Sequence, residues 1–99
     1  MRGQPRRVVV YTTTWCGDCR RAKRYLDEHG IVYEEVDIER DPEAAERVVR
    51  WSGGYRTVPT FDIDGQIIVD WDRRAVARAL GLDEGASSRE LSDREASPA

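Results

Sequence analysis

Apolar positions change their spacing from one segment of the chain to the next, and each spacing predicts a type of element. The continuous apolar and β-branched run at residues 7–13 predicts a strand that is buried on both faces. Residues 17–28 carry apolar side chains at helical spacing, and Gly30 follows where that helix would end. Residues 31–38 place acidic side chains between apolar ones, which predicts a second strand.

The middle of the chain predicts a second helix and then a hairpin. Asp41 and Pro42 are typical of a helix start, with Asp41 as the N-cap and Pro42 as the first helical residue. Asp64-Gly65 is a strong signal for a two-residue turn, so we expect antiparallel strands at 61–63 and 66–69.

A third helix completes the predicted order β-α-β-α-β-β-α. Asp72 is in position to cap a helix over residues 73–80. This order predicts an α/β fold in which one mixed four-stranded sheet is flanked by three helices. We expect a single domain over residues 7–82, a flexible leader at 1–6 and a flexible polar tail at 83–99.

Composition and charge narrow the class of protein. The 99 residues are 39% hydrophobic and 35% charged, a polar balance that still permits a core because the apolar residues cluster in periodic segments. The formal net charge of -3 gives no electrostatic reason to expect a nucleic-acid partner. The N-terminal apolar run is too short for a signal peptide, and no stretch is long enough to cross a membrane. We therefore expect a soluble cytoplasmic monomer.

The chain has two cysteines, and they form a Cys-x-x-Cys motif. Cys16 and Cys19 lie between the predicted strand at 7–13 and the predicted helix at 17–28, which is the context of a redox motif. A sulfur at a helix N-terminus faces unpaired N–H groups and the positive end of the helix dipole, and both favour the thiolate. We therefore predict that Cys16 attacks disulfides and that Cys19, one turn further on, resolves the product.

Other uses of this cysteine pair agree less well with the sequence. A zinc site needs further Cys or His ligands, and the single histidine of the chain, His29, does not lie at ligand spacing, so no metal is expected. A structural disulfide would not stay oxidised in a reducing compartment. The remaining alternative is that both cysteines are small buried hydrophobic residues.

With these residues in place, the chain resembles the glutaredoxins of the thioredoxin fold over about residues 7–81. The resemblance is carried by the Cys-x-x-Cys motif, by Thr57-Val58-Pro59 and by the Asp64-Gly65 turn. It implies that Pro59 follows a cis peptide bond and lies against the cysteines. It also implies that the backbone of Val58 pairs with the peptide-like part of a bound thiol.

Further substrate-binding candidates surround this motif. Gly17 leaves room for a substrate, and Trp15 offers an exposed aromatic docking face, with simple loop packing as the alternative. Arg56 precedes the Thr57-Val58-Pro59 segment and could clamp a carboxylate or a sugar hydroxyl, with a solvated loop arginine as the alternative. By analogy with glutaredoxins, Asp72 is a candidate for an amine or amide of the ligand.

Details of the motifs resemble the mycoredoxins more narrowly. These glutaredoxin-like proteins of actinobacteria use mycothiol in place of glutathione, and the resemblance lies in Trp15-Cys16-Gly17 and in residues 53–60. Ordinary glutaredoxins have a lysine where this chain has Thr13, and Gly-Gly where it has Val69-Asp70. The resemblance implies no bound cofactor and a small thiol, mycothiol or glutathione, as co-substrate.

We therefore predict a thiol–disulfide oxidoreductase that reduces mixed disulfides between proteins and a mycothiol-type small thiol. Its partners would be S-thiolated or disulfide-bonded proteins, the small thiol and a flavin-dependent disulfide reductase. One alternative is a dithiol electron donor recharged by thioredoxin reductase, because Trp51-Ser52-Gly53 and Arg56 resemble the redoxins that serve ribonucleotide reductase. A second alternative is a protein that holds a metal or iron–sulfur cluster through Cys16.

Overall fold

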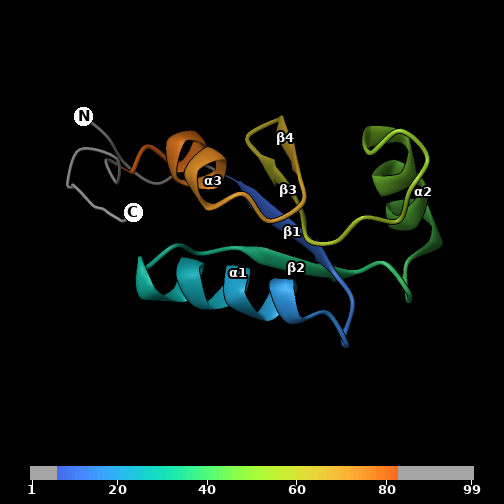
Figure 1. Cartoon of the computed structure of the whole chain (residues 1–99), viewed down its shortest axis with the longest axis horizontal. Helices are drawn as coiled ribbons and strands as arrows, with labels where there is room; N and C mark the ends of the chain where they lie inside the picture. The colour runs from blue at the N-terminus through green and yellow to red at the C-terminus, as the bar shows by residue number, and fades with distance from the viewer. Residues whose placement is uncertain (1–6, 83–99) are drawn as a thin grey trace, which may run out of the picture.

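The computed structural model describes residues 7–82, so the leader expected at 1–6 and the tail expected at 83–99 lie outside the described residues. Figure 1 shows the order of elements that the sequence predicts. The strands and helices are β1 (Val8–Thr12), α1 (Gly17–Glu28), β2 (Glu34–Asp37), α2 (Pro42–Trp51), β3 (Thr60–Ile63), β4 (Gln66–Val69) and α3 (Arg73–Leu80).

The four strands form one mixed sheet in the order β2-β1-β3-β4. Strand β1 pairs with β2 in parallel and with β3 in antiparallel register, and β3 pairs with β4 through the predicted turn at Asp64-Gly65. The α/β class, the mixed four-stranded sheet and the three helices are therefore confirmed. Because β1 is central, its carboxyl end delivers the Cys-x-x-Cys motif to the middle of one sheet edge.

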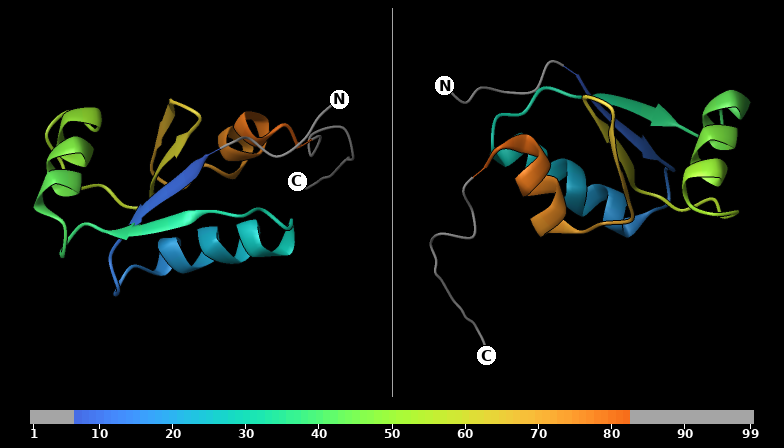
Figure 2. Two further views of the ribbon diagram at one scale, coloured as in Figure 1. Left: turned by 180° about the vertical axis from the view of Figure 1, so that it is seen from behind. Right: turned by 90° about the horizontal axis from the view of Figure 1, so that it is seen from above.

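Helices cover both faces of the sheet, and the apolar periodicity explains which helix covers which face (Figure 2). One cluster joins α1 and α3 to alternate residues of β1, including Val8 and Val10, around the fully buried Phe61. The opposite face carries α2, which packs on Val9 and Tyr11. This alternation is why the first strand has no polar face.

The second strand is shorter than predicted. The sequence pattern extends over residues 31–38, whereas β2 covers only Glu34–Asp37. Ile31 is buried in the α1 core cluster before the strand begins, and Ile38 is buried under α2 after it ends. The predicted strand is too long because it includes apolar residues that pack against helices. Strand β2 itself lies at the edge of the sheet, and its first residues are exposed.

Each helix begins at a side-chain cap. The carboxylate of Asp41 accepts a hydrogen bond from the backbone N–H of Ala44 at 3.1 Å, and that of Asp72 accepts one from Ala75 at 3.1 Å. Both caps confirm the sequence prediction. The cap of α1 is the sulfur of Cys16.

Candidate active site

The sulfur of Cys16 serves as the N-cap of α1. It accepts a hydrogen bond from the backbone N–H of Cys19 at 3.1 Å, in the position where a serine or aspartate oxygen would cap other helices. The N–H donor and the positive end of the helix both stabilise negative charge on this sulfur. Cys16 is 8% exposed, so the sulfur lies just beneath the surface.

Cys19 lies in the first turn of α1 and is only 1% exposed. Burial is the largest cause that raises the pKa of its thiol, to about 12, and the hydrogen bond and charge of Cys16 raise it further. A backbone hydrogen bond from Thr13 and the charge of Lys23 act in the opposite direction. Both cysteines are free thiols, and at rest Cys19 stays protonated at neutral pH.

The Thr57-Val58-Pro59 segment closes the site from the β3 side. The bond between Val58 and Pro59 is cis, as the family resemblance implies. The Cys16 thiol lies 3.7 Å from the carbonyl oxygen of Val58, to which it can donate. The hydroxyl of Thr60 donates to the carbonyl of Thr57 at 2.8 Å and fixes the turn. The structure therefore brings Cys16, Val58 and Pro59 together at one end of the sheet.

Trp15 is 67% exposed beside Cys16, and its indole N–H donates to the carboxylate of Glu39 at 3.1 Å. The predicted surface position of the ring is thus confirmed. Gly17 is the first residue of α1, and a Cβ there would come no closer than 3.8 Å to the Arg21 guanidinium, so the helix itself does not require glycine. The predicted role of Gly17 in leaving room for a substrate stays a prediction.

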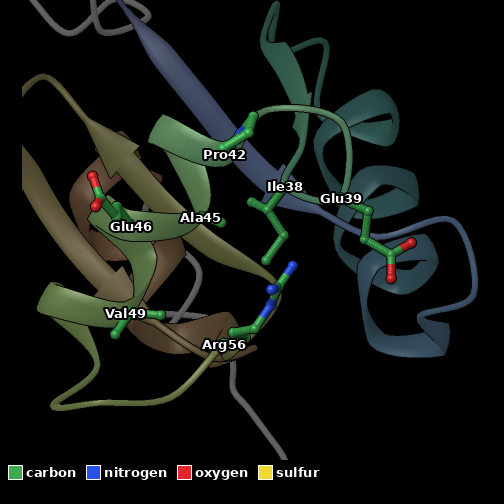
Figure 3. A pocket seen from close by; sticks show the side chains of 7 residues that line it. All are labelled: Ile38, Glu39, Pro42, Ala45, Glu46, Val49 and Arg56. Atoms are coloured by element: carbon green, nitrogen blue, oxygen red, sulfur yellow. The ribbon is translucent and has the colours of Figure 1, made fainter.

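Arg56 lines a cavity of about 370 Å³ between α2 and the segment before the cis peptide bond. Figure 3 shows its guanidinium pointing toward Ile38. The walls combine apolar side chains with two carboxylates, and the lining residues are Ile38, Glu39, Pro42, Ala45, Glu46, Val49 and Arg56. Glu39 also accepts the Trp15 hydrogen bond, so this cavity adjoins the loop that carries Cys16.

Asp72 lies at the start of α3, where its carboxylate is used as the helix cap. Asp70, two residues earlier, donates its backbone N–H to the carbonyl of Pro59 at 2.9 Å, which places this loop next to the cis-proline turn. The contacts of Asp72 are therefore those of a capping residue at the border of the site, and ligand binding by Asp72 stays a prediction.

Sequence reasoning missed three parts of the site. It did not single out the Cys16 sulfur as the side-chain cap of the first helix. It did not single out Glu39, because no local pattern shows that this carboxylate reaches Trp15 across 24 residues. It also did not anticipate that the Thr13 hydroxyl is buried and has no hydrogen-bond partner among the described residues.

Within residues 7–82, no group of three or more His, Cys, Asp or Glu side chains is arranged so that it could hold a metal ion. In the same part of the chain, none of the helices has the length and the apolar character that crossing a bilayer demands.

The sequence model of the glutaredoxin family matches residues 8–68. A protein of Mycobacterium tuberculosis that is named as a glutaredoxin is 53% identical over 64 residues, which cover 64% of this chain and 76% of that protein. The chain belongs to the glutaredoxin family. It is accordingly a glutaredoxin-like thiol–disulfide oxidoreductase, and glutaredoxins use glutathione-like small thiols as co-substrates.

The chain is also similar to a second kind of small redox protein in sequence and to a thioredoxin-like protein in structure. The glutaredoxin-like protein NrdH of Lactococcus lactis is 35% identical over 57 residues, which cover 58% of this chain and 76% of that protein. The crystal structure of the thioredoxin-like protein BC3987 superposes with a TM-score of 0.67 at 28% identity, over 75% of this chain and 100% of that chain. This glutaredoxin therefore has similarity to more than one branch of the small redoxins.

Proposed function

We propose that this glutaredoxin removes a mycothiol-type small thiol from S-thiolated proteins, with Cys16 as the nucleophile. The observation that supports this assignment is the position of the Cys16 sulfur. It caps α1, accepts the Cys19 N–H at 3.1 Å and faces the Val58 carbonyl at 3.7 Å. The Cys19 N–H and the N-terminus of α1 favour negative charge on this sulfur, and the Val58 contact places it beside the cis-proline turn, along which we propose that a substrate sulfur arrives.

The proposed reaction has two exchange steps. The Cys16 thiolate attacks the sulfur of the small thiol in the mixed disulfide, and the protein thiolate leaves and takes up a proton. The small thiol is then held on Cys16 as a new mixed disulfide. In the external route, a second molecule of the small thiol attacks the sulfur of the bound one, so that the Cys16 thiolate leaves and the disulfide of two small thiols is released. In the internal route, Cys19 attacks the Cys16 sulfur, a disulfide forms between the two cysteines, and the small thiol leaves reduced. A flavin-dependent disulfide reductase would return the oxidised small thiol to its reduced form.

The cavity beside Arg56 supports mycothiol over glutathione. Mycothiol carries neutral sugar rings where glutathione carries carboxylates. The carboxylates of Glu39 and Glu46 line this cavity, together with the single cation Arg56. Carboxylates accept hydrogen bonds from sugar hydroxyls and a guanidinium donates hydrogen bonds to them, whereas acidic side chains repel an incoming carboxylate. The mycobacterial relative at 53% identity is consistent with the same choice.

The test uses Cys19→Ser, in which an adduct on Cys16 cannot be resolved from within the protein. The variant is offered an equal mixture of oxidised mycothiol, glutathione and bacillithiol, and the product is weighed by intact mass spectrometry. We expect a dominant mycothiol adduct. Glu46→Gln should raise the share of the glutathione adduct, whereas Glu43→Gln should not, because Glu43 lies on the same helix and outside the cavity.

Other outcomes of this experiment redirect the assignment. A dominant glutathione or bacillithiol adduct would contradict the proposed thiol but keep the chemistry. No adduct at all would favour the second candidate, a dithiol electron donor recharged by thioredoxin reductase. That candidate is supported by the 35% identity to the NrdH protein of Lactococcus lactis and by the resemblance of Trp51-Ser52-Gly53 and Arg56 to the redoxins that serve ribonucleotide reductase. NADPH consumption with thioredoxin reductase would then measure it directly.

The remaining parts of the proposal concern the cellular compartment, the oligomeric state and the residues that bind the substrates. A dithiol centre that must return to its reduced form is suited to a reducing compartment, so we place the protein in the cytoplasm. We propose that it acts as a monomer on thiolated proteins, with Trp15 and Gly17 beside the reacting sulfur as the docking surface. Thr57, Val58 and Pro59 would bind the backbone of the small thiol, and Asp72 would take its amide.

A further inference from the structure

A lysine lies between the resolving cysteine and the edge strand of the sheet. Lys23 follows Cys19 by four residues on α1, so the two side chains share one face of the helix. The Lys23 ammonium lies 2.9 Å from the carboxylate of Glu35 on β2, and its side chain is only 29% exposed. Figure 1 shows α1 lying alongside β2, which is how the contact is made.

The partner carboxylate is itself held in place. Glu35 accepts a second hydrogen bond, from the hydroxyl of the buried Thr12, at 2.8 Å. Thr12 is the last residue of β1 and directly precedes Thr13, whose backbone hydrogen-bonds to Cys19. The contact therefore ties Lys23 to the same strand end that supports the buried sulfur.

Both members of the pair keep their charge near neutral pH. The hydrogen bond to Glu35 is the main cause that raises the pKa of Lys23. Burial by itself raises the pKa of Glu35, but the hydrogen bonds from Lys23 and Thr12 outweigh it and lower the pKa. The lysine is thus a permanent cation, restrained on the side of α1 that carries Cys19.

We propose that Lys23, held by Glu35 and Thr12, is a positioning residue that stabilises the thiolate of Cys19 when it resolves an adduct on Cys16. This proposal deepens the function proposed above and rests on it. It implies that Lys23 favours internal resolution of the adduct by Cys19 over external resolution by a second small thiol.

The step assisted by Lys23 is an exchange of one S–S bond. Cys19 loses its proton to solvent, and its thiolate attacks the Cys16 sulfur. A bond forms between Cys16 and Cys19, the bond from Cys16 to the small thiol breaks, and the leaving thiolate is protonated. The two cysteines are oxidised to a disulfide and the small thiol is released reduced. A fixed cation near Cys19 lowers the free energy of the charged sulfur before attack.

Other nearby cations are placed differently. The guanidinium of Arg21 pairs with Asp18 at 2.9 Å, and the side chain of Arg24 is exposed. The charged and titratable groups that act on Cys19 are Cys16 and Lys23, both on its own helix, and the backbone of Thr13 adds a hydrogen bond from the β1 side. The pairing with Glu35 is therefore what distinguishes Lys23 from the other basic residues of α1.

The experiment follows release of a coloured thiolate. Reaction with Ellman's reagent places one thionitrobenzoate on Cys16, and attack by Cys19 then releases a second equivalent whose absorbance is timed. We expect Lys23→Gln to slow this second release by about threefold to tenfold at neutral pH. Lys23→Arg should restore most of the rate, and Lys23→Glu should be slower than Lys23→Gln. Arg24→Gln, which removes a charge from the same turn, is the matched control and should release at the wild-type rate.

A direct titration separates an electrostatic role from a structural one. In Cys16→Ser, Cys19 is the remaining cysteine, and the rate at which iodoacetamide alkylates it, followed by intact mass at several pH values, reports its titration. We expect Lys23→Gln to move the midpoint of this titration to higher pH, and Arg24→Gln to leave it in place. A release rate that falls equally for Lys23→Gln, Lys23→Arg and Lys23→Glu, with an unmoved titration midpoint, would overturn the proposal.

The two steps of the same experiment keep this proposal distinct from the proposed function. If Cys16 is not the nucleophile, the first equivalent of thionitrobenzoate fails to attach to Cys16, whatever residue is at position 23. If only the role of Lys23 is wrong, the first step is normal and the second proceeds at the wild-type rate in Lys23→Gln.

Discussion

Cys16 and Cys19 are three residues apart at the start of α1, yet they lie in two different regions of the site. Cys16 is 8% exposed, caps the helix and faces the Val58 carbonyl of the cis-proline turn. Cys19 is 1% exposed and lies among the backbone of Thr13, the sulfur of Cys16 and the charge of Lys23. The Cys16 sulfur faces the cis-proline turn, where we propose that substrates arrive, and the Cys19 sulfur lies deeper.

This difference implies that the two sulfurs are active at different times. Burial, followed by the hydrogen bond and charge of Cys16, raises the pKa of the Cys19 thiol to about 12, so Cys19 is protonated while Cys16 is free. Once Cys16 is bonded to a small thiol, its sulfur cannot ionise, so its contributions to the raised pKa of Cys19 are removed. The buried cysteine is therefore easier to ionise in the adduct than in the resting protein.

The largest predicted effect is the loss of activity in Cys16→Ser. Serine keeps the helix cap but is a far weaker nucleophile than a thiolate, so reduction of a mycothiol–protein mixed disulfide should fall to the uncatalysed rate. Cys19→Ser should retain activity whenever free small thiol is supplied. A coupled assay of protein thiol release measures both variants, and equal losses in the two would remove the distinction between the cysteines.

The next largest effect is the pH dependence of internal resolution. The pKa of Cys19 is raised well above neutral pH. As long as the pH is below this pKa, each increase of one pH unit raises the thiolate fraction of Cys19 by about tenfold. In the absence of free small thiol, release of an adduct from Cys16 should therefore become faster throughout the range from neutral to mildly alkaline pH. Stopped-flow release at several pH values measures this, and a rate that levels off at about pH 9 would indicate an ordinary, exposed thiol, whose pKa is about 8.5.

A smaller effect concerns stability, and it should have opposite signs at the two positions. At position 16, serine can cap α1 and alanine cannot, so Cys16→Ala should have a free energy of unfolding about 1 kcal/mol lower than Cys16→Ser. At position 19, a serine hydroxyl would be buried, at a cost of about 1–3 kcal/mol, so Cys19→Ala should be the more stable variant there. Urea denaturation of the four variants gives both differences.

The smallest predicted effect separates small-thiol binding from internal resolution. Arg56 lines the cavity on the Cys16 side of the site, so Arg56→Gln should raise the KM for the small-thiol substrate by about twofold to fivefold. Release of an existing adduct by Cys19 should be unchanged, because that step does not use the cavity. A change of similar size in the release rate would show that the two regions are not independent.

Much of the fold could be predicted from local patterns. The caps at Asp41 and Asp72, the Asp64-Gly65 turn and the helical bounds follow from short-range chemistry, and the structure confirms them. The boundaries of β2 could not be predicted, because Ile31 and Ile38 lie outside the strand and are buried against helices on opposite faces of the sheet. The spacing of apolar residues indicates which positions are buried, but it does not indicate which helix or strand buries them.

The candidate site divides in the same way. The motif at Cys16 and Cys19 and the Thr57-Val58-Pro59 segment can be found from sequence, since their residue types are characteristic. The contacts of Glu39 with Trp15, and of Lys23 with Glu35, join residues that are 24 and 12 positions apart. No local rule predicts such pairs, because they depend on how the helices are placed against the strands.

The most direct test of the account compares two variants in one experiment. Cys16→Ser and Cys19→Ser are each exposed to an oxidised small thiol at neutral pH, and their masses are measured over time. The account predicts rapid addition of one small thiol to Cys19→Ser and none to Cys16→Ser, because Cys16 is the less buried of the two cysteines and its sulfur accepts the Cys19 N–H at the start of α1. Comparable addition to Cys19 in the Cys16→Ser protein would contradict the division of roles between the two sulfurs.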